Sequence, residues 1–142
     1  MRFARQIARF RALWRRHRSL GQRGERAAER FVRKMGYQIV GRRQRGRLGE
    51  LDLVAVDGRT VVFIEVKTRR SHHAGHPAEA VGPDKQKRLT RLALAYLKRH
   101  DLLEHRARFD VLGITWPDDA AKPTIEHFKN AFEAVGRGQM FS

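Results

Sequence analysis

The stretch that decides the fold is GELDLVAVDGRTVVFIEVKTR, which occupies residues 49–69. Two runs rich in Val, Ile and Leu, at residues 50–56 and 60–68, meet at Asp57-Gly58. Asp-Gly between two such runs is the strongest short-range signal for a β-hairpin. The stretch therefore predicts two antiparallel strands, connected by a loop at Asp57-Gly58 or one residue later at Gly58-Arg59.

This hairpin brings two carboxylates together. Because side chains alternate between the faces of a strand, Asp52 in the first arm lies on the same face as Glu65 and Lys67 in the second arm. A loop at Asp57-Gly58 would place Asp52 diagonal to Glu65, and a loop at Gly58-Arg59 would place the two directly opposite. Moving the loop by one residue shifts the pairing by two, so both registers leave the Cβ atoms roughly 5 to 8 Å apart.

The apolar neighbours of these residues predict a largely buried sheet, in which an unpaired carboxylate is costly. Lys67 can neutralise one of the two acids, and a divalent cation would satisfy the remaining negative charge. A site made of oxygen ligands suits Mg²⁺ or Mn²⁺. On spacing alone, a salt-bridged surface at the end of a half-exposed hairpin explains the same residues about equally well.

The sequence on the N-terminal side of the hairpin predicts a helix and then a strand. Apolar residues recur at helical spacing from around residues 19–24, and Gly36 can end the helix; they are Ala27, Ala28, Phe31, Val32 and Met35. Residues 37–42 have the pattern of a strand. The arginines that follow, around two glycines, predict a basic turn at residues 42–47.

On the C-terminal side, a loop at residues 69–83 containing Gly, Pro and three histidines precedes a second helix. Asp84 can cap this helix, which should run to about Leu103. Residues 108–115 and 124–128 predict two closing strands. The order of helix, three strands, helix and two strands is typical of a mixed α/β fold.

Composition narrows the class of partner and excludes several kinds of site. The 142 residues include 31 Lys and Arg against 15 Asp and Glu, a net charge of +16, which attracts nucleic acid or an anionic membrane surface. The absence of cysteine excludes disulfides, thiolate zinc sites and cysteine nucleophiles. No apolar run approaches the roughly 20 residues that span a bilayer. We expect a cytoplasmic protein without stable membrane insertion.

Three segments carry a resemblance to a known family: GERAAERF at 24–31, GELDLVA at 49–55 and FIEVKTR at 63–69. They resemble the YraN-like family of small bacterial proteins, whose core is similar to the PD-(D/E)xK nuclease superfamily of Holliday-junction resolvases and restriction endonucleases. The resemblance covers roughly residues 20–115. It implies a restriction-endonuclease-like αβββαβ core with a central mixed sheet flanked by helices. One departure is Leu51, which stands where the literal motif has proline.

The resemblance also implies a role for each site residue. Asp52, Glu65 and Lys67 would be the catalytic residues, the two acids as metal ligands and Lys67 as the catalytic lysine. The backbone carbonyl of Val66 would be a further ligand. Glu25 would be the helix-borne metal ligand of resolvase-like members, although Glu in a first helical turn is also favoured simply by the helix dipole.

Three segments are expected along the chain. Residues 1–18 hold seven arginines and no acid, with aromatic and aliphatic residues on one helical face, and predict a basic amphipathic extension. This extension could pack on the domain or lie on nucleic acid, attach to a membrane surface or act in targeting, or be a frayed tail. Residues 19–130 form the nuclease-like domain, and residues 131–142 a loose tail.

Basic residues on both sides of the site are candidates for contact with nucleic acid. One group lies near the first hairpin arm and could hold a strand that enters the site: Arg42, Arg43, Arg45 and Arg47. A second group lies at the start of the second helix and suits phosphate contacts: Lys85, Gln86 and Arg88. An ordinary solvated helix face explains the second group nearly as well.

Other polar residues have a simpler interpretation. Glu50 shares the face of Asp52, but its place at the strand start favours an exposed rim residue. Glu29 is interpreted as a surface charge and Asp110 as structural. The loop histidines are interpreted as solvated because no complete ligand set accompanies them; they are His72, His73 and His76.

The first functional hypothesis is a Mg²⁺- or Mn²⁺-dependent endonuclease that hydrolyses phosphodiester bonds of DNA, including branched or damaged DNA. Such hydrolysis must neutralise a growing negative charge and generate a nucleophile from water. The alternative is a nucleic-acid-binding accessory protein on a nuclease scaffold with little or no turnover. DNA is favoured over RNA as the partner, and resolution of a junction would favour a homodimer because two strands must be cut.

Overall fold

The computed structural model describes residue 5 and residues 20–71, 81–118 and 120–135. Within residues 20–71, 81–118 and 120–135, two helices and five strands follow one another in the order α2 (Leu20–Lys34), β1 (Gln38–Gly46), β2 (Gly49–Asp57), β3 (Thr60–Arg69), α3 (Pro83–Arg99), β4 (Ala107–Thr115) and β5 (Thr124–Phe132). The strands form one sheet in the order β1-β2-β3-β4-β5, in which β3 and β4 are parallel and the other neighbours antiparallel. The predicted αβββαβ core with a mixed central sheet is confirmed.

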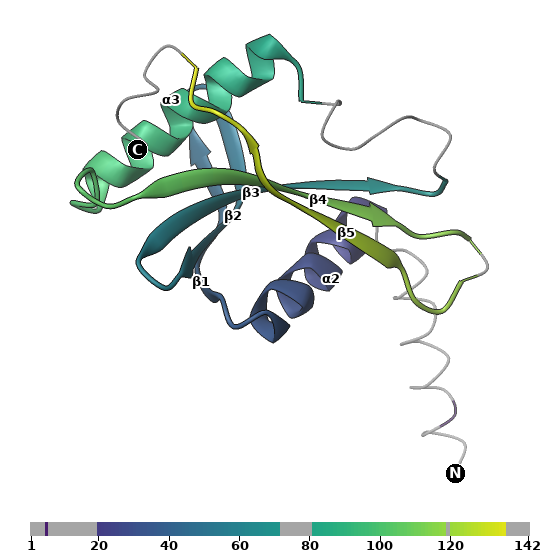
Figure 1. The fold of residues 1–142 in the computed structure, drawn as a ribbon. Helices are drawn as coiled ribbons and strands as arrows, with labels where there is room; N and C mark the ends of the chain where they lie inside the picture. The colour runs from purple at the N-terminus through teal and green to yellow at the C-terminus, as the bar shows by residue number, and fades with distance from the viewer. Residues whose placement is uncertain (1–4, 6–19, 72–80, 119, 136–142) are drawn as a thin grey trace.

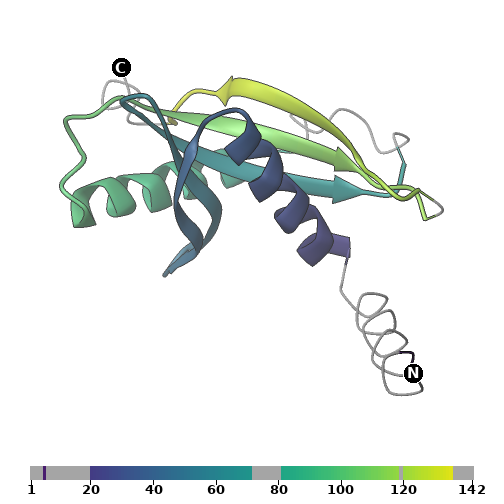
Figure 2. The same cartoon turned by 90° about the horizontal axis from the view of Figure 1, so that it is seen from below.

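The two helices cover opposite faces of this sheet (Figures 1 and 2). Helix α2 buries Ala27, Ala28 and Val32 against one face. Helix α3 buries Leu89, Leu92, Ala93, Tyr96 and Leu97 against the other face, at the spacing of three and four residues that produces an apolar stripe. The sheet is therefore buried on both sides along its central strands.

The hairpin of β2 and β3 adopts one of the two predicted registers. Asp57 pairs with Thr60, so the loop is Gly58-Arg59, and Gly58 has a φ of 62°, which glycine adopts without the steric cost that other residues meet. The ladder continues to the pair Leu53 and Ile64. Asp52 and Glu65 are the next residues outward and lie opposite one another.

The first strand corrects one prediction. Arg42, Arg43 and Arg45, expected in a basic turn, lie within β1, and only Arg47 lies in the turn that follows. β1 is an edge strand that pairs with β2 as far as Gly46. Charged side chains on an exposed edge strand remain in water and do not oppose strand formation, so the run of arginines was a poor signal for a turn.

Both ends of α3 also differ from the prediction. Gly82 is the N-cap and makes no side-chain cap hydrogen bond, so Asp84 lies in the first turn and does not cap the helix. The helix ends at Arg99, before the expected Leu103, because Asp101 adopts a left-handed backbone with φ 57°. The amide of Leu102 then donates to the carbonyl of Leu97 at 2.7 Å and closes the last turn.

The last strand extends further than expected. β5 continues beyond residue 128 to Phe132; Ala134 is buried, and the amide of Val135 donates to the Thr90 hydroxyl on α3 at 3.1 Å. Residues 131–135, assigned to the tail, thus pack on the core. The described residues leave out 1–4, 6–19, 72–80, 119 and 136–142. The predictions for the N-terminal extension, apart from Arg5, and for the loop histidines therefore lie outside the described residues. No helix in the described ranges is long and apolar enough to cross a bilayer.

Gly24 sets the closeness of α2 to β3. It is buried, and a Cβ added to it would overlap the side chain of Thr68. We expect Gly24→Ala to lower the free energy of unfolding by about 1–3 kcal/mol, as overpacking does. Gly21→Ala is the matched control, since nothing lies within 4 Å of its position and alanine favours the helix. Chemical denaturation measures both, and equal effects of the two variants would contradict the close approach.

Candidate functional site

The site lies where β2 and β3 stop pairing. The last paired residues are Leu53 and Ile64, and beyond them the amide of Val66 donates to Oδ2 of Asp52 at 2.9 Å. The N–H and C=O of one strand residue point toward the same neighbouring strand. The carbonyl of Val66 therefore faces the same gap as Asp52, and a side-chain carboxylate takes the place of the next backbone pair.

Glu65 is the buried carboxylate of the site. Its residue is 7% exposed, and Oε1 lies 2.5 Å from Nζ of Lys85 and 3.6 Å from Nζ of Lys67. Lys67 follows on the same strand, whereas Lys85 comes from the first turn of α3. Burial and the neighbouring Lys85 ammonium lower the pKa of Lys67. The two lysines thus share one oxygen of Glu65.

Asp52 has an unusual acidity. Burial, followed by the negative charge of Glu65, raises its pKa to about 7, although the hydrogen bond from the Val66 amide acts in the opposite direction. Two carboxylates in a low-dielectric gap cannot both ionise without added positive charge. Two carboxylates and a backbone carbonyl form an oxygen donor set that fits a hard divalent cation such as Mg²⁺ or Mn²⁺.

Two further acids adjoin Asp52. Carboxylate oxygens of Glu25, Glu50 and Asp52 all lie within 4.8 Å of one another. Glu25 reaches this place from the second turn of α2, whereas the sequence predicted it in the first turn, which contains no acid. Glu50 was interpreted as an exposed rim residue, but its side chain is only 31% exposed. Strand alternation, which puts Glu50 on the same face as Asp52, is the sequence signal for this proximity. The interpretation as a rim residue gave more weight to the position of Glu50 at the start of the strand.

The arginines expected near the first hairpin arm are paired with these acids. Arg43 lies 2.6 Å from Glu25, and Arg45 lies 3.2 Å from Glu50. Arg42 forms an ion pair with Glu29 at 2.6 Å. Glu29 was interpreted as a surface charge, but its side chain is only 21% exposed. Arg47 is exposed in the turn between β1 and β2.

The group at the start of α3 divides into different roles. Lys85 is bonded to Glu65, as described above. The side-chain amide of Gln86 donates to the carbonyl of Val81 at 2.8 Å and so holds the start of the helix. Arg88 is exposed and lines the pocket beside the site. Of these three residues, Arg88 is the one most open to a phosphate.

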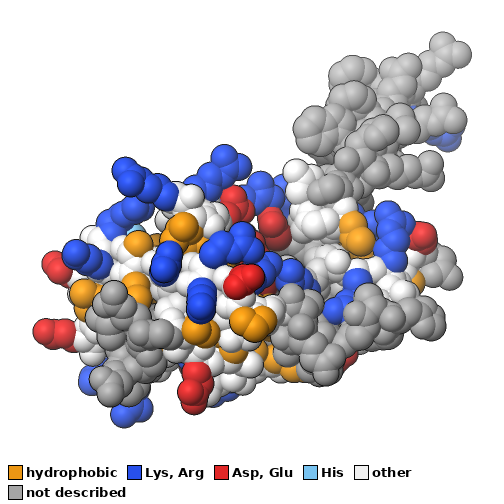
Figure 3. All heavy atoms as spheres, turned by 90° about the horizontal axis from the view of Figure 1, so that it is seen from above, with side chains coloured by type: hydrophobic (Ala, Val, Ile, Leu, Met, Phe, Trp, Pro, Cys, Tyr) orange, Lys and Arg blue, Asp and Glu red, His pale blue; other side chains and the backbone are white. Residues whose placement is uncertain are grey.

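Asp52 lies between two hollows. A groove of about 720 Å³ runs between α2 and β1, and its lining includes Arg26, Arg30, Arg33, Arg42 and Arg43. A pocket of about 240 Å³ opens on the α3 side, and its lining includes Leu48, Glu50, Glu65, Lys85 and Arg88. Figure 3, which looks onto the α3 side, shows more Lys and Arg than acidic side chains on that face.

The comparisons with known proteins agree with the resemblance found in the sequence. The pattern of Uncharacterised protein family UPF0102 matches residues 24–114. A UPF0102 protein of Rhodopirellula baltica is 47% identical over 120 residues, which cover 82% of this chain and 72% of the relative. A UPF0102 protein of Geobacter sulfurreducens is 49% identical over 114 residues, which cover 80% and 88%. This chain belongs to UPF0102.

The predicted YraN-like family is thereby confirmed. The range matched by UPF0102 begins at Gly24 and includes all four acids around the gap between β2 and β3, together with Lys67 and Lys85. The close approach of α2 to β3, which brings Glu25 to Asp52, also lies inside this range. The UPF0102 segment therefore contains the whole candidate site.

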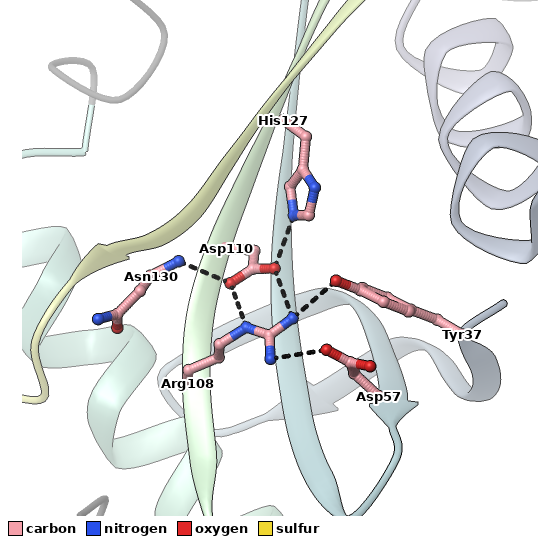
Figure 4. Close-up of polar contacts among 6 residues, drawn as sticks. All are labelled: Tyr37, Asp57, Arg108, Asp110, His127 and Asn130. Carbon is pink, nitrogen blue, oxygen red and sulfur yellow. Dashed lines mark hydrogen bonds and ion pairs between the residues drawn. The ribbon is translucent and has the colours of Figure 1, made fainter. Parts of the chain in front are cut away.

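A second polar cluster lies away from this site, at the loop end of the hairpin. It consists of Tyr37, Asp57, Arg108, Asp110, His127 and Asn130 (Figure 4). Asp110 is fully buried; it accepts hydrogen bonds from Arg108 and the Asn130 amide, and Nε2 of His127 lies 2.7 Å from Oδ2. Arg108 also donates to Asp57 and Tyr37. The cluster joins β2, β4 and β5 to Tyr37, which directly precedes β1, in keeping with the structural role expected for Asp110.

The acidity of Asp52 has a consequence for stability. Its pKa is about 7 in the folded chain and about 3.9 in an unfolded chain. Between these values the folded state holds a proton that the unfolded state has released, so the free energy of unfolding falls as pH rises through this range. We expect Asp52→Asn, which cannot ionise, to be more stable than the parent above pH 7, with an advantage that shrinks toward about pH 4.

Chemical denaturation in metal-free buffer over a series of pH values measures this difference. Glu126→Gln is the matched control, since Glu126 is exposed on the edge strand β5. An advantage of Asp52→Asn that did not vary with pH would contradict the raised pKa.

Proposed function

We propose that this protein is a Mg²⁺- or Mn²⁺-dependent endonuclease that hydrolyses phosphodiester bonds of DNA. The observation that carries the proposal is the convergence of Asp52, Glu65 and the Val66 carbonyl on one gap in the sheet, with Lys67 beside them. The raised pKa of Asp52 supports it, because burial and the neighbouring Glu65 disfavour charge on Asp52 and a bound cation would favour it.

Each residue has a distinct part in this proposal. The cation would be held by Asp52, Glu65 and the carbonyl of Val66. Glu25, on α2, would be a further ligand. When bound, the cation would supply positive charge to the phosphate and acidity to the attacking water. Lys67 is 28% exposed and lies at the edge of the gap. Its ammonium suits contact with the charged phosphate, and its lowered pKa suits proton transfer from water.

The groove between α2 and β1 supports a nucleic acid as the substrate. Arg26, Arg30 and Arg33 are spaced along one side of α2 and span roughly 10 Å of helix, and they line the same groove as Asp52. The described lining of this groove has more arginines than any other residue type, which suits contacts to phosphates. It fits recognition of a backbone without regard to sequence. The choice of DNA over RNA rests on the family resemblance.

One observation favours a second candidate, a nucleic-acid-binding accessory protein with little turnover. Glu65 already has an ammonium group 2.5 Å away, from Lys85. The buried carboxylate is therefore neutralised by the chain itself, and the fold does not require a cation at this place. In this case the arginine-lined groove would bind nucleic acid equally well with and without metal.

Cleavage of labelled linear, single-stranded and four-way-junction DNA in Mg²⁺, Mn²⁺ or EDTA separates the two candidates. We expect metal-dependent cleavage by the parent and loss to background in Asp52→Ala, which lacks a ligand. Lys67→Ala should be slower by roughly a hundredfold or more, the usual contribution of a proton-transferring group.

Glu126→Ala, purified identically, controls for contaminating nucleases and should cut as the parent does. Equal cleavage by the parent and Asp52→Ala would exclude the proposed site. Binding of all four proteins to DNA without cleavage would support the accessory protein.

A further inference from the structure

Lys85 is ion-paired with Glu65, one of the two carboxylates proposed to hold the cation. Its Nζ lies 2.5 Å from Oε1 of Glu65, shorter than the 3.6 Å between the same oxygen and Lys67. Glu65 is almost fully buried, so its charge requires a partner at all times. A divalent cation on the Glu65 carboxylate would bring two positive charges within a few ångströms of the Lys85 ammonium, and like charges at that separation repel strongly.

We infer that Lys85 and the divalent cation exchange on Glu65: the Lys85 ammonium neutralises this carboxylate when the metal is absent and leaves it when the metal binds. This inference rests on the proposed function, because it takes the metal site of that proposal as given. It assigns to Lys85 a role as the counter-ion of Glu65 in the metal-free site, in addition to the phosphate contact predicted from its sequence position.

The surroundings of Lys85 allow this movement without a change of fold. The amide of Gln86 donates to Gly82 at 2.9 Å, and its side chain donates to Val81, so the backbone at this turn of α3 is anchored. The Lys85 side chain is 31% exposed and borders the pocket of about 240 Å³. Rotation about its four-carbon stem can carry the ammonium into this pocket, and the backbone stays in place.

Lys67 is less suited to such an exchange. It lies on the same strand as Glu65, two residues further on, and both side chains project from the same face of β3. Lys67 therefore stays next to the carboxylate in either state. Lys85 comes from a different element, and its departure leaves the geometry of β3 unchanged.

The exchange has a consequence for the substrate. Arg88 lies one turn of α3 from Lys85 and lines the same pocket. A released Lys85 ammonium would stand beside Arg88, where both can contact a phosphate next to the gap. Metal occupancy would thus supply a phosphate contact that the metal-free site withholds.

Calorimetric titration of Mn²⁺ into Lys85→Met tests the exchange directly. Methionine keeps the length and apolar stem of the side chain but removes the competing ammonium. We expect Lys85→Met to bind Mn²⁺ roughly tenfold or more tightly than the parent, the ratio that corresponds to losing a hydrogen-bonded ion pair. Lys87→Met is the matched control, because it removes the same charge from an exposed position of the same helix and should change affinity little.

Mn²⁺ affinity of Lys85→Met that equals or falls below that of Lys87→Met would overturn the exchange, since Lys85 would then remain on Glu65 in the metal-bound site. If the parent and every variant bind no Mn²⁺, the proposed metal site fails and the exchange fails with it. Binding by the parent with no gain in Lys85→Met overturns the exchange alone.

A measurement on the unaltered protein gives a second readout. Acetylation of lysine side chains by an activated ester, followed by peptide mass spectrometry, reports how available each amine is. Mn²⁺ should increase the labelling rate of Lys85 and leave that of Lys87 unchanged. A rate at Lys85 that stayed constant or fell on addition of Mn²⁺ would contradict release of the ammonium.

Discussion

Asp52 and Glu65 meet in a gap between β2 and β3, where burial and the neighbouring Glu65 carboxylate disfavour charge on Asp52 and create a need for positive charge. The gap exists because the backbone pairing between the strands ends at Leu53 and Ile64. Beyond this pair, the Asp52 carboxylate accepts a hydrogen bond from the Val66 amide. The raised pKa of Asp52 and the short contact of Lys85 with Glu65 both follow from this need for positive charge. The elements around the gap supply positive groups to it.

The packing of the helices determines which charges reach the gap. Gly24 lets α2 approach β3 closely enough for Glu25 to come near Asp52, while the first turn of α3 places Lys85 on Glu65. Arginines on β1 pair with the outer acids Glu25 and Glu50. The positive groups beside the inner acids Asp52 and Glu65 are Lys67, Lys85 and the proposed cation.

Local signals in the sequence were enough for the hairpin and for its two central acids. Asp57-Gly58 predicted the loop to within one residue, and strand alternation kept Asp52 and Glu65 on one face in either register. The pairing of Lys85 with Glu65 joins residues 20 apart through the packing of α3, and the contact of Glu50 with Glu25 depends on how α2 crosses the sheet. Neither leaves a local pattern. The prediction of a basic turn at the arginines of β1 was wrong because charge alone does not distinguish an edge strand from a turn.

The most direct test of the central claim is the position of a bound ion. Crystals grown or soaked with Mn²⁺ and measured near the manganese absorption edge would show the ion by its anomalous scattering. We predict a peak between Asp52, Glu65 and the carbonyl of Val66, at distances near 2.0–2.3 Å, roughly those of octahedral and related oxygen ligands. A peak confined to Glu25 and Glu50, or no peak in the gap, would contradict a metal centre built on the two buried carboxylates.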